Sequence, residues 1–538
     1  MSDETSLWMA IALFLIGMLA LGYSGHEQSR TLGGYLLADR RLRGSQAGLS
    51  AGASDASWWL ILLLPAAAYS TGMHAAWIPI GLILGAWFAW TVVAPRLRSY
   101  APIAGDAITV PTFFDRRTHD SSHLLRIASA LLILVFFTFY LAAGMRIGGS
   151  FFASAFGTSE LVGLVVVGAV TTVYVLFGGM RGVANAHVVQ ALLMAGGLVL
   201  VAVTAVRELG GWDATRAVVE SVAPESTSLL AGGVGAGLFT ALAWGLGYLG
   251  QPQALVRMMA LRSPRAARSA RRVLIGWLVI SLGAAIVVGL ATLAYFEQSW
   301  RPLNRPEDAY PRLAELLFSP FVGGLLLTVV LAAVMSTAAS QLLLCSSALV
   351  EDLYRLIVRT EQPRRRHAGL ARLAVLVVAA VAAMLAYSGR TGAVDLFAFA
   401  WAGFGATFAP LVLLSLFWRR LTSWGALAGL ASGAVVVFVW TQAGLDDTLH
   451  ELLPAFAMNL LVAVLVSRLT AAPSAAVTAE YEEMTDRLPA PGLLRRGGVR
   501  LVALIGAGLA AAVPAPAVES DRTAAVGDVM DTTRAAGS

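Results

Sequence analysis

Residues 51–60 read Ala51-Gly52-Ala53-Ser54-Asp55-Ala56-Ser57-Trp58-Trp59-Leu60 and lie inside an apolar run that continues to Pro65. The run is long enough to span a bilayer, yet it carries an acid, Asp55, near its middle. An ionised carboxylate at the bilayer centre costs several kcal/mol, so it persists only beside a cavity or a partner. The small residues and serines around it favour local unwinding, which frees backbone carbonyls to bind a cation. This stretch predicts an ion or substrate site at the membrane midplane; the alternative is a structural pair between Asp55 and an arginine.

The composition predicts an all-α membrane protein. Hydrophobic residues make up 58% of the 538 residues and charged residues only 13%, whereas charged residues make up about a quarter of soluble domains. The apolar residues form continuous runs rather than the short alternating segments of a membrane-spanning barrel. The net charge of +6 does not indicate nucleic-acid binding, because the basic residues are spread over loops. Cys345 is the only cysteine, which excludes an intrachain disulfide.

Thirteen apolar runs are long enough to be transmembrane helices. They lie near residues 8–23, 46–69, 74–95, 124–156, 160–178, 186–206, 232–256, 273–296, 319–350, 370–387, 394–418, 424–443 and 451–469. With the N-terminus outside, the cytoplasmic loops hold 24 arginines and the outer loops hold 6. Cytoplasmic loops carry the excess of basic residues, so we expect the N-terminus outside and the C-terminus in the cytoplasm.

The composition changes after residue 470. We therefore expect a transmembrane domain over 1–470 and a partly disordered cytoplasmic tail over 471–538. The apolar stretch 501–513 in this tail has only 13 residues, which is short for a transmembrane helix. A segment lying at the membrane surface is expected there, rather than a fourteenth transmembrane helix.

A second informative stretch, residues 332–340, places the adjacent hydroxyls of Ser336 and Thr337 in a long apolar run. A hard cation such as Na⁺ takes oxygen ligands, including carbonyls and hydroxyls. The two hydroxyls, the Ala333 carbonyl one turn earlier and the unwound carbonyls of Ala53 and Ala56 would supply such a set. Alternatively, the hydroxyls bond to carbonyls of their own helix or to a neighbouring helix.

The third stretch is Trp244-Gly245-Leu246-Gly247-Tyr248-Leu249-Gly250-Gln251-Pro252. Its glycines and Pro252 predict a broken helix. Trp244 and Tyr248 lie four residues apart, on one face, where they would form the walls of an apolar pocket with polar edges. Tyr140 also lies in the middle of an apolar segment; by itself it would indicate a packed core.

The two predicted breaks, at 53–58 and near 245–252, fall at corresponding places in two sets of five helices, 46–206 and 232–418. This is the pattern of a five-plus-five inverted-repeat transporter with discontinuous helices, whose site lies at the repeat interface. The prediction rests on the breaks and their spacing, because no internal sequence repeat is visible.

The chain resembles the sodium:solute symporter family, and within it the sodium/proline symporters. The matching stretches run in order through residues 30–470 and are 49–55, 81–86, 244–252, 331–337, 341–343, 345–348, 351–354 and 400–406. The resemblance implies thirteen helices, a five-plus-five core and secondary active uptake across the cell membrane, with Na⁺ as coupling ion and L-proline or a similar small zwitterion as solute. The expected partners are that solute, the sodium ion and the lipid bilayer, with no nucleic acid.

By this resemblance, the sodium site is matched by Ala53, Ala56, Ala333, Ser336 and Thr337. Positions tied to substrate binding or coupling are matched by Asp55, Ser57, Trp59, Tyr140, Trp244, Tyr248 and Pro252.

Two stretches depart from the pattern of the proline symporters. Ala56 and Trp58 stand where those proteins have Met and Gly, and Trp58 either reshapes the pocket or points to lipid. Asn185-Ala186-His187 replaces Trp-Thr-Asp, so His187 is either a pH-sensitive replacement or a solvated histidine at a helix end.

Other functions remain as alternatives at this stage. The same mechanism could serve another small amino acid, a carboxylate or a vitamin. A membrane enzyme would need clustered His, Cys or paired carboxylates at membrane depth, and the predicted spans offer none. A transporter-like sensor would need a signalling domain, for which the tail after residue 470 is too short.

Overall fold

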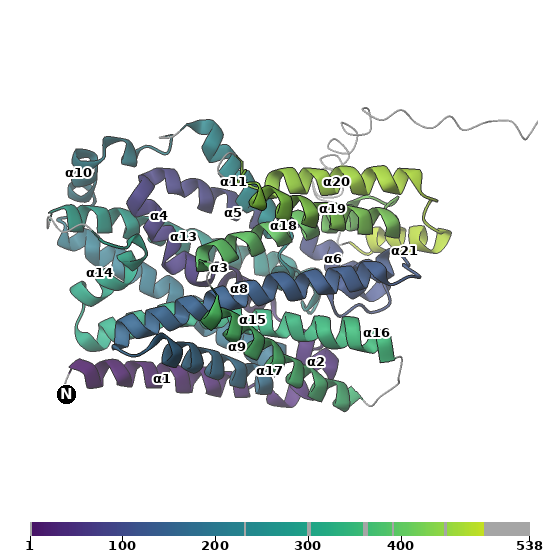
Figure 1. Cartoon of the computed structure of the whole chain (residues 1–538), viewed down its shortest axis with the longest axis horizontal. Coiled ribbons are helices and arrows are strands. Elements are labelled where there is room, and N and C mark those ends of the chain that lie inside the picture. Colours follow the sequence, from purple (N-terminus) through teal and green to yellow (C-terminus); the bar gives the residue numbers. More distant parts are fainter. Residues whose placement is uncertain are drawn as a thin grey trace, which may run out of the picture. The chain divides into compact units, whose positions relative to one another are not determined.

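The computed structural model describes residues 3–230, 233–298, 303–358, 364–389, 392–445 and 449–488. Nearly all residues in these ranges are helical, and they contain no strand beyond an isolated bridge between Leu42 and Leu261. The predicted all-α class is therefore confirmed (Figure 1). The part of the tail after residue 488, including 501–513, lies outside the described residues.

The helices of the first part of the chain include α3 (Gly44–Ile61), which carries Ala53, Asp55 and Ala56 of the predicted sites. They are α1 (Asp3–Tyr23), η1 (His26–Arg30), α2 (Leu32–Leu37), η2 (Ala38–Arg40), α3 (Gly44–Ile61), α4 (Leu63–Thr71), η3 (Gly72–Ala76), α5 (Trp77–Phe88), the π-helix η4 (Ala89–Val93), α6 (Ala94–Ile103), α7 (Val110–Arg117), α8 (Leu124–Phe156), α9 (Glu160–Glu208) and α10 (Trp212–Val222).

The remaining helices carry the aromatic and hydroxyl residues of the second part. They are η5 (Pro224–Thr227), α11 (Val234–Leu249), α12 (Pro252–Met259), α13 (Ala266–Gln298), η6 (Pro306–Asp308), α14 (Ala309–Leu317), α15 (Pro320–Ser347), the π-helix η7 (Ala348–Tyr354), α16 (Arg355–Val358), α17 (Arg364–Ser388), α18 (Ala393–Phe417), α19 (Ser423–Gln442), α20 (Leu452–Leu469) and α21 (Ala475–Asp486).

Ten segments of the described chain are long and apolar enough to cross a membrane: Thr5–Tyr23, Leu63–Ile103, Leu124–Ala155, Glu160–Glu208, Ala266–Phe296, Pro320–Val358, His367–Ser388, Ala393–Phe417, Ser423–Gln442 and Leu452–Leu469. The predicted runs 160–178 and 186–206 lie on either side of Gly179 within α9, where the non-helical φ of 52° and ψ of −158° kink the element between two helical parts. The predicted run 232–256 is divided between α11 and α12. The count of thirteen transmembrane helices therefore stays a prediction.

The first predicted break is confirmed in α3. Ser57 adopts φ 46° and ψ −170°, whereas its neighbours continue the helix. This backbone conformation is essentially restricted to glycine and costs a non-glycine residue on the order of 1–3 kcal/mol. The carbonyls just before it accept side-chain hydrogen bonds: that of Ala53 from Ser336, that of Ser54 from Thr337 and that of Asp55 from Trp59.

The second predicted break separates α11 from α12. Gly250 and Gln251 connect the two helices, and Pro252 occupies the first turn of α12, where a missing N–H is tolerated. Gly250 lies against the backbone of Phe404 and Ala409 in α18, so a Cβ at this position would clash with that backbone. The break is thus fixed by close packing as well as by the proline.

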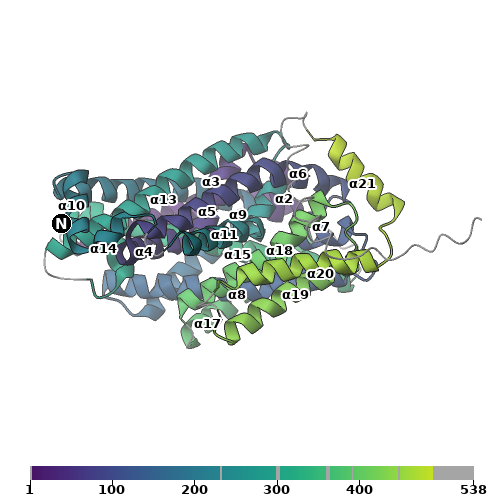
Figure 2. The same cartoon turned by 90° about the horizontal axis from the view of Figure 1, so that it is seen from above.

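Burial shows which helices form the centre of the bundle. Within their most apolar windows, α15 is 83% buried and α18 is 78% buried, whereas α1 and α20 are each 28% buried. Helix α3 packs against α9, α13 and α15, and α11 packs against α5 and α18. Helices α19 and α20 pair with each other, as Figures 1 and 2 show. Both broken helices therefore contact the most buried helices.

The conformation of Ser57 yields a prediction about stability. Ser57→Val should lower the free energy of unfolding by about 2 kcal/mol, because a β-branched residue tolerates this backbone conformation least. Ser57→Gly should be at least as stable as the parent, because glycine adopts it without strain. Thermal unfolding in detergent measures both effects. Ser281→Val, at a buried helical position of α13, is the matched control and should change the melting temperature much less.

Candidate functional site

The predicted sodium residues meet where the break in α3 faces α15. The Ser336 hydroxyl donates to the Ala53 carbonyl at 2.8 Å and also contacts the Ala333 carbonyl at 2.9 Å. The Thr337 hydroxyl donates to the Ser54 carbonyl at 3.1 Å and lies 3.4 Å from the Ala333 carbonyl. Each hydroxyl thus contacts its own helix and a neighbouring helix together. The result is a cluster of neutral oxygens from two helices.

The break in α3 explains why these carbonyls are available. The indole N–H of Trp59 donates to the Asp55 carbonyl at 2.9 Å, and Thr337 binds the preceding Ser54 carbonyl. Ala56 is buried directly before the strained Ser57. Neutral hydroxyls and carbonyls are the ligands that Na⁺ takes from proteins. The oxygens therefore fit a sodium ion, and the role of Ala56 stays a prediction.

Asp55 is 2% exposed and forms no ion pair among the described residues. Its Oδ1 accepts a hydrogen bond of 2.8 Å from Nε2 of Gln253 in α12, whereas its Oδ2 has no partner. Asp55 thus has no direct ion pair with an arginine among the described residues, and the nearest link to one runs through Gln253 to Arg257 of α12. Tyr248 lies close to Asp55, and its hydroxyl accepts a hydrogen bond from Nε1 of Trp90 at 2.9 Å.

Aromatic rings from α3, α8, α11 and α18 pack together beside Asp55. The ring centroids of Trp59 and Trp244 are 5.0 Å apart, and those of Trp244 and Trp401 are also 5.0 Å apart. Phe397 lies 5.2 Å from Tyr140 and 5.5 Å from Trp58. We call these residues, Trp58, Trp59, Tyr140, Trp244, Phe397 and Trp401, the aromatic cluster.

Several buried polar atoms around the aromatic cluster have no hydrogen-bond partner. They are Asp55 Oδ2, Ser57 Oγ, Trp58 Nε1, Tyr140 Oη and Trp401 Nε1. Leaving one such atom without a hydrogen bond costs on the order of 1–3 kcal/mol. Several such atoms close together therefore indicate a place where a bound ligand would supply the missing partners. Donors and acceptors next to apolar rings suit a small solute with charged ends and an apolar body.

The structure brings most of the predicted substrate residues together. Trp59, Tyr140 and Trp244 belong to the aromatic cluster, and Asp55 and Ser57 supply unpartnered polar atoms beside it. The remaining two act differently: the Tyr248 hydroxyl is engaged by Trp90, and Pro252 shapes the start of α12. Their part in substrate binding stays a prediction.

The burial of Trp58 and His187 decides between the alternatives that the sequence left open for these two residues. Trp58 is fully buried and its ring packs edge-on against Phe397, so the alternative that it points to lipid is wrong. His187 is also fully buried, so the alternative of a solvated histidine is wrong. Its Nδ1 lies 3.0 Å from the Ser50 hydroxyl.

Sequence reasoning missed Phe397, Trp401 and Gln253 as site residues. Phe397 and Trp401 stand four residues apart in an apolar helix, which is the same signal that identified Trp244 and Tyr248. Gln253 follows Pro252 directly, and a buried amide beside a predicted helix break is a signal for a partner of an intramembrane acid.

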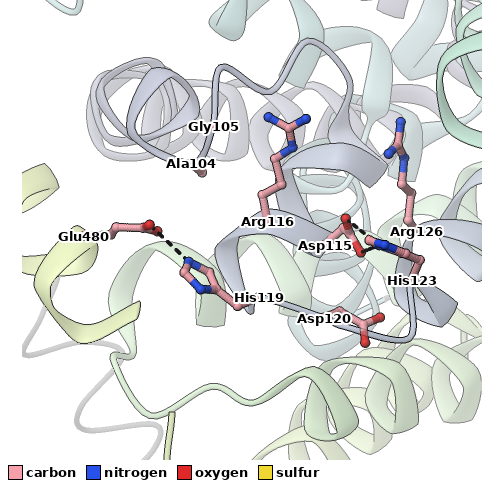
Figure 3. A pocket seen from close by; sticks show the side chains of 9 residues that line it. All are labelled: Ala104, Gly105, Asp115, Arg116, His119, Asp120, His123, Arg126 and Glu480. Carbon is pink, nitrogen blue, oxygen red and sulfur yellow. Dashed lines mark hydrogen bonds and ion pairs between the residues drawn. The ribbon is translucent and has the colours of Figure 1, made fainter. Parts of the chain in front are cut away.

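A cavity of about 310 Å³ lies apart from these residues, between α6, α7 and α21. Figure 3 shows His119 directed to Glu480 and His123 directed to Asp115, with separations of 3.0 Å in both pairs. Burial raises the pKa of the Asp115 carboxyl, and the hydrogen bond with His123 opposes this shift. The cavity contains none of the predicted site residues, and it marks where α21 docks on the bundle.

An arginine of α7 contributes to the docking of α21, which yields a second prediction. Arg117 of α7 lies 5.3 Å from the ring centroids of both Tyr100 and Tyr481, and a desolvated cation–π contact is worth about 2 kcal/mol. Tyr481→Ala should therefore release α21 and speed amide hydrogen exchange in it at least about tenfold. Tyr481→Phe keeps the ring and should exchange like the parent. Equal exchange in Tyr481→Ala and the parent would contradict this account of the docking.

Two broken helices that meet buried helices around neutral oxygens, an acid and an aromatic cluster are features of a helical secondary transporter. The fold agrees with that class. It is similar to a substrate-bound, outward-open Na⁺-coupled sialic acid symporter with a TM-score of 0.75 and 18% identity, over 87% of this chain and 99% of that chain.

The sequence comparisons give the family. The model of the sodium:solute symporter family matches residues 35–433. The high-affinity proline transporter PutP of Bacillus subtilis is 45% identical over 471 residues, which is 88% of this chain and 100% of that protein. The sodium/proline symporter of Staphylococcus aureus strain Newman is 40% identical over 491 residues, covering 89% and 96%. The chain belongs to the sodium:solute symporter family, and it is a multi-pass membrane transporter rather than an enzyme.

Proposed function

We propose that this chain is a symporter that takes up L-proline across the cell membrane, driven by the Na⁺ gradient. The relatives that match nearly the whole chain are named as a proline transporter and a sodium/proline symporter. The observation that carries the proposal is local: the Ser336 and Thr337 hydroxyls contact the broken α3 beside the unpartnered Asp55 Oδ2 and the aromatic cluster.

In this proposal the sodium ion is held by the hydroxyls of Ser336 and Thr337 and by the carbonyls of Ala53, Ala56 and Ala333. Each hydroxyl now donates to a carbonyl, and a hydroxyl can rotate to offer its lone pairs to a cation instead. The ion would then replace two weak hydrogen bonds by stronger ion–oxygen contacts. Because the ligands come from α3 and α15, binding would fix one helix against the other.

The solute would bind next to the ion. The secondary amine of proline suits the Asp55 carboxylate, and its apolar ring suits the faces of Trp59, Trp244 and Tyr140. The N-terminus of α12, which begins at Pro252 after the break, offers a partial positive charge to the solute carboxylate. Ser57, Tyr248 and the Gln251 amide lie at the edges of this arrangement.

The arrangement in the membrane follows the same proposal. The N-terminus lies outside and the C-terminus in the cytoplasm, with a transmembrane domain over 1–470 and a tail over 471–538. The inverted repeats comprise about 46–206 and 232–418 within thirteen transmembrane helices. The arginine distribution and the breaks at Ser57 and Gly250 support this arrangement.

The experiment that tests the function is uptake of radiolabelled L-proline into proteoliposomes. With an inward Na⁺ gradient, proline should accumulate above its external concentration, and replacing Na⁺ by N-methyl-D-glucamine should abolish accumulation. A sodium ionophore that collapses the gradient should do the same. Accumulation that is unchanged without Na⁺ would overturn the proposal.

The main alternative is a different solute with the same coupling. Trp58 favours testing this alternative, because its buried ring takes part in the aromatic cluster where the proline symporters have glycine. Inhibition of proline uptake by an excess of unlabelled amino acids, carboxylates or vitamins separates the candidates. Stronger inhibition by one of these than by unlabelled proline would reassign the solute.

A further inference from the structure

A fully buried arginine lies behind the acid of the site. Arg257 in α12 is 1% exposed, and its Nε donates to the Ser50 hydroxyl of α3 at 2.8 Å. Its Nη1 donates to the Gln253 carbonyl at 2.7 Å, and its Nη2 donates to the Ser340 hydroxyl of α15 at 2.7 Å. Nη2 also lies 3.1 Å from Nδ1 of His187 in α9. One guanidinium therefore joins four helices.

Arg257 and Asp55 are linked through Gln253 rather than by direct contact. Among the described residues Arg257 forms no ion pair, and its guanidinium bonds only to neutral groups. Gln253 stands between them: its carbonyl accepts from Arg257 and its Nε2 donates to Asp55 Oδ1 at 2.8 Å. A buried cation without a carboxylate partner is costly. The guanidinium of Arg257 is separated from the carboxylate of Asp55 only by Gln253, so the two opposite charges balance each other.

The same guanidinium reaches the sodium residues. The Ser340 hydroxyl, which accepts from Arg257, donates to the Ser336 carbonyl at 3.1 Å. Ser336 is the residue whose hydroxyl binds the broken segment of α3 at Ala53. A series of contacts thus runs from Asp55 through the side chain and backbone of Gln253, Arg257 and Ser340 to the backbone carbonyl of Ser336, the residue whose hydroxyl is a proposed sodium ligand.

His187 fixes the geometry of this series of contacts. A guanidinium only donates hydrogen bonds, so Nδ1 of His187 must accept the one from Arg257 and carries no proton. Its Nε2 is buried and has no partner. The imidazole is therefore held neutral in one tautomer beside the cation.

We propose that Arg257 and His187 are positioning residues that couple the sodium site to the solute site. Arg257 holds Gln253 against Asp55 and Ser340 against the sodium helix, and His187 fixes the guanidinium in the orientation that reaches both. When Na⁺ draws α3 and α15 together, the same hydrogen bonds hold the Asp55 carboxylate in the orientation that binds the solute. The inference rests on the proposed Na⁺-coupled proline transport.

The test measures the dissociation constant of proline for purified protein with and without Na⁺. Couplings between ligand sites commonly reach about 5–150-fold in affinity, and the parent should show a ratio in this range. Arg257→Met keeps the volume and removes the bonds, so its ratio should fall to within about twofold of one. The control Arg372→Met removes another arginine that joins helices, through the Leu176 and Ser29 carbonyls, and should retain the parental ratio.

If Arg257→Met does not fold, a second pair of variants, at His187, tests whether the two residues couple the sites. His187→Gln supplies an amide oxygen that can accept from Arg257, and it should retain most of the ratio. His187→Leu has no acceptor, and it should lose the ratio at a similar melting temperature.

The outcomes separate the inference from the function on which it rests. If Arg257→Met or His187→Leu keeps the parental ratio and loses only thermal stability, these residues are merely structural and the inference is wrong. A parent protein that shows no Na⁺ effect on proline binding would instead overturn the proposed function itself.

Discussion

Replacing Ser336 and Thr337 together by alanine is expected to remove the Na⁺ stimulation of proline uptake. The two hydroxyls are the side-chain oxygens that join α15 to the Ala53 and Ser54 carbonyls. Alanine leaves the carbonyls without a side-chain oxygen beside them, so the Na⁺ concentration for half-maximal uptake should rise at least about tenfold, the equivalent of losing 1.4 kcal/mol of ion binding. Initial rates of proline uptake over a series of Na⁺ concentrations measure this.

The matched control lies on the same helix. The Thr328 hydroxyl donates to the Leu325 carbonyl of its own helix at 2.7 Å, away from α3. Thr328→Ala should keep the parental Na⁺ dependence. A double variant Ser336→Ala, Thr337→Ala with the same Na⁺ dependence as Thr328→Ala would exclude these hydroxyls from the sodium site.

Trp244→Ala should weaken proline binding in saturating Na⁺ by about 100-fold, because a buried aromatic residue at the centre of a binding site is worth 2–4 kcal/mol. Its ring is the central member of the aromatic cluster, in contact with both Trp59 and Trp401 at 5.0 Å. Trp244→Phe keeps an apolar ring and should lose far less affinity. Equilibrium binding of radiolabelled proline to folded, monodisperse protein measures both variants.

A second tryptophan serves as control. Trp440 of α19 donates to the Leu449 carbonyl at 2.9 Å and takes no part in the aromatic cluster. Trp440→Ala should bind proline like the parent. If Trp244→Ala also binds like the parent, the aromatic cluster is packing alone and the solute binds elsewhere.

The sequence alone was enough to predict those features of the site that are energetically unfavourable in an ordinary membrane helix. Asp55 in an apolar run and Pro252 among glycines are costly in such a helix, and both lie at breaks in the structure. The hydroxyl pair Ser336 and Thr337 was recognisable for the same reason, and it reaches the α3 carbonyls as expected.

Other features depend on three-dimensional contacts that residue types do not reveal. Phe397 resembles any core aromatic until α18 is placed against Tyr140. Arg257 reads as one more basic residue after an apolar run, yet the structure buries it completely. Such residues become functional only through their neighbours from distant segments.

The central claim is that Na⁺ and proline bind to this chain in a coupled manner, and equilibrium binding tests it most directly. The dissociation constant of radiolabelled proline should be at least about tenfold lower in NaCl than in N-methyl-D-glucamine chloride, and proline should lower that of Na⁺ by the same factor, because linkage is reciprocal. Equal proline affinity in the two salts would contradict the account.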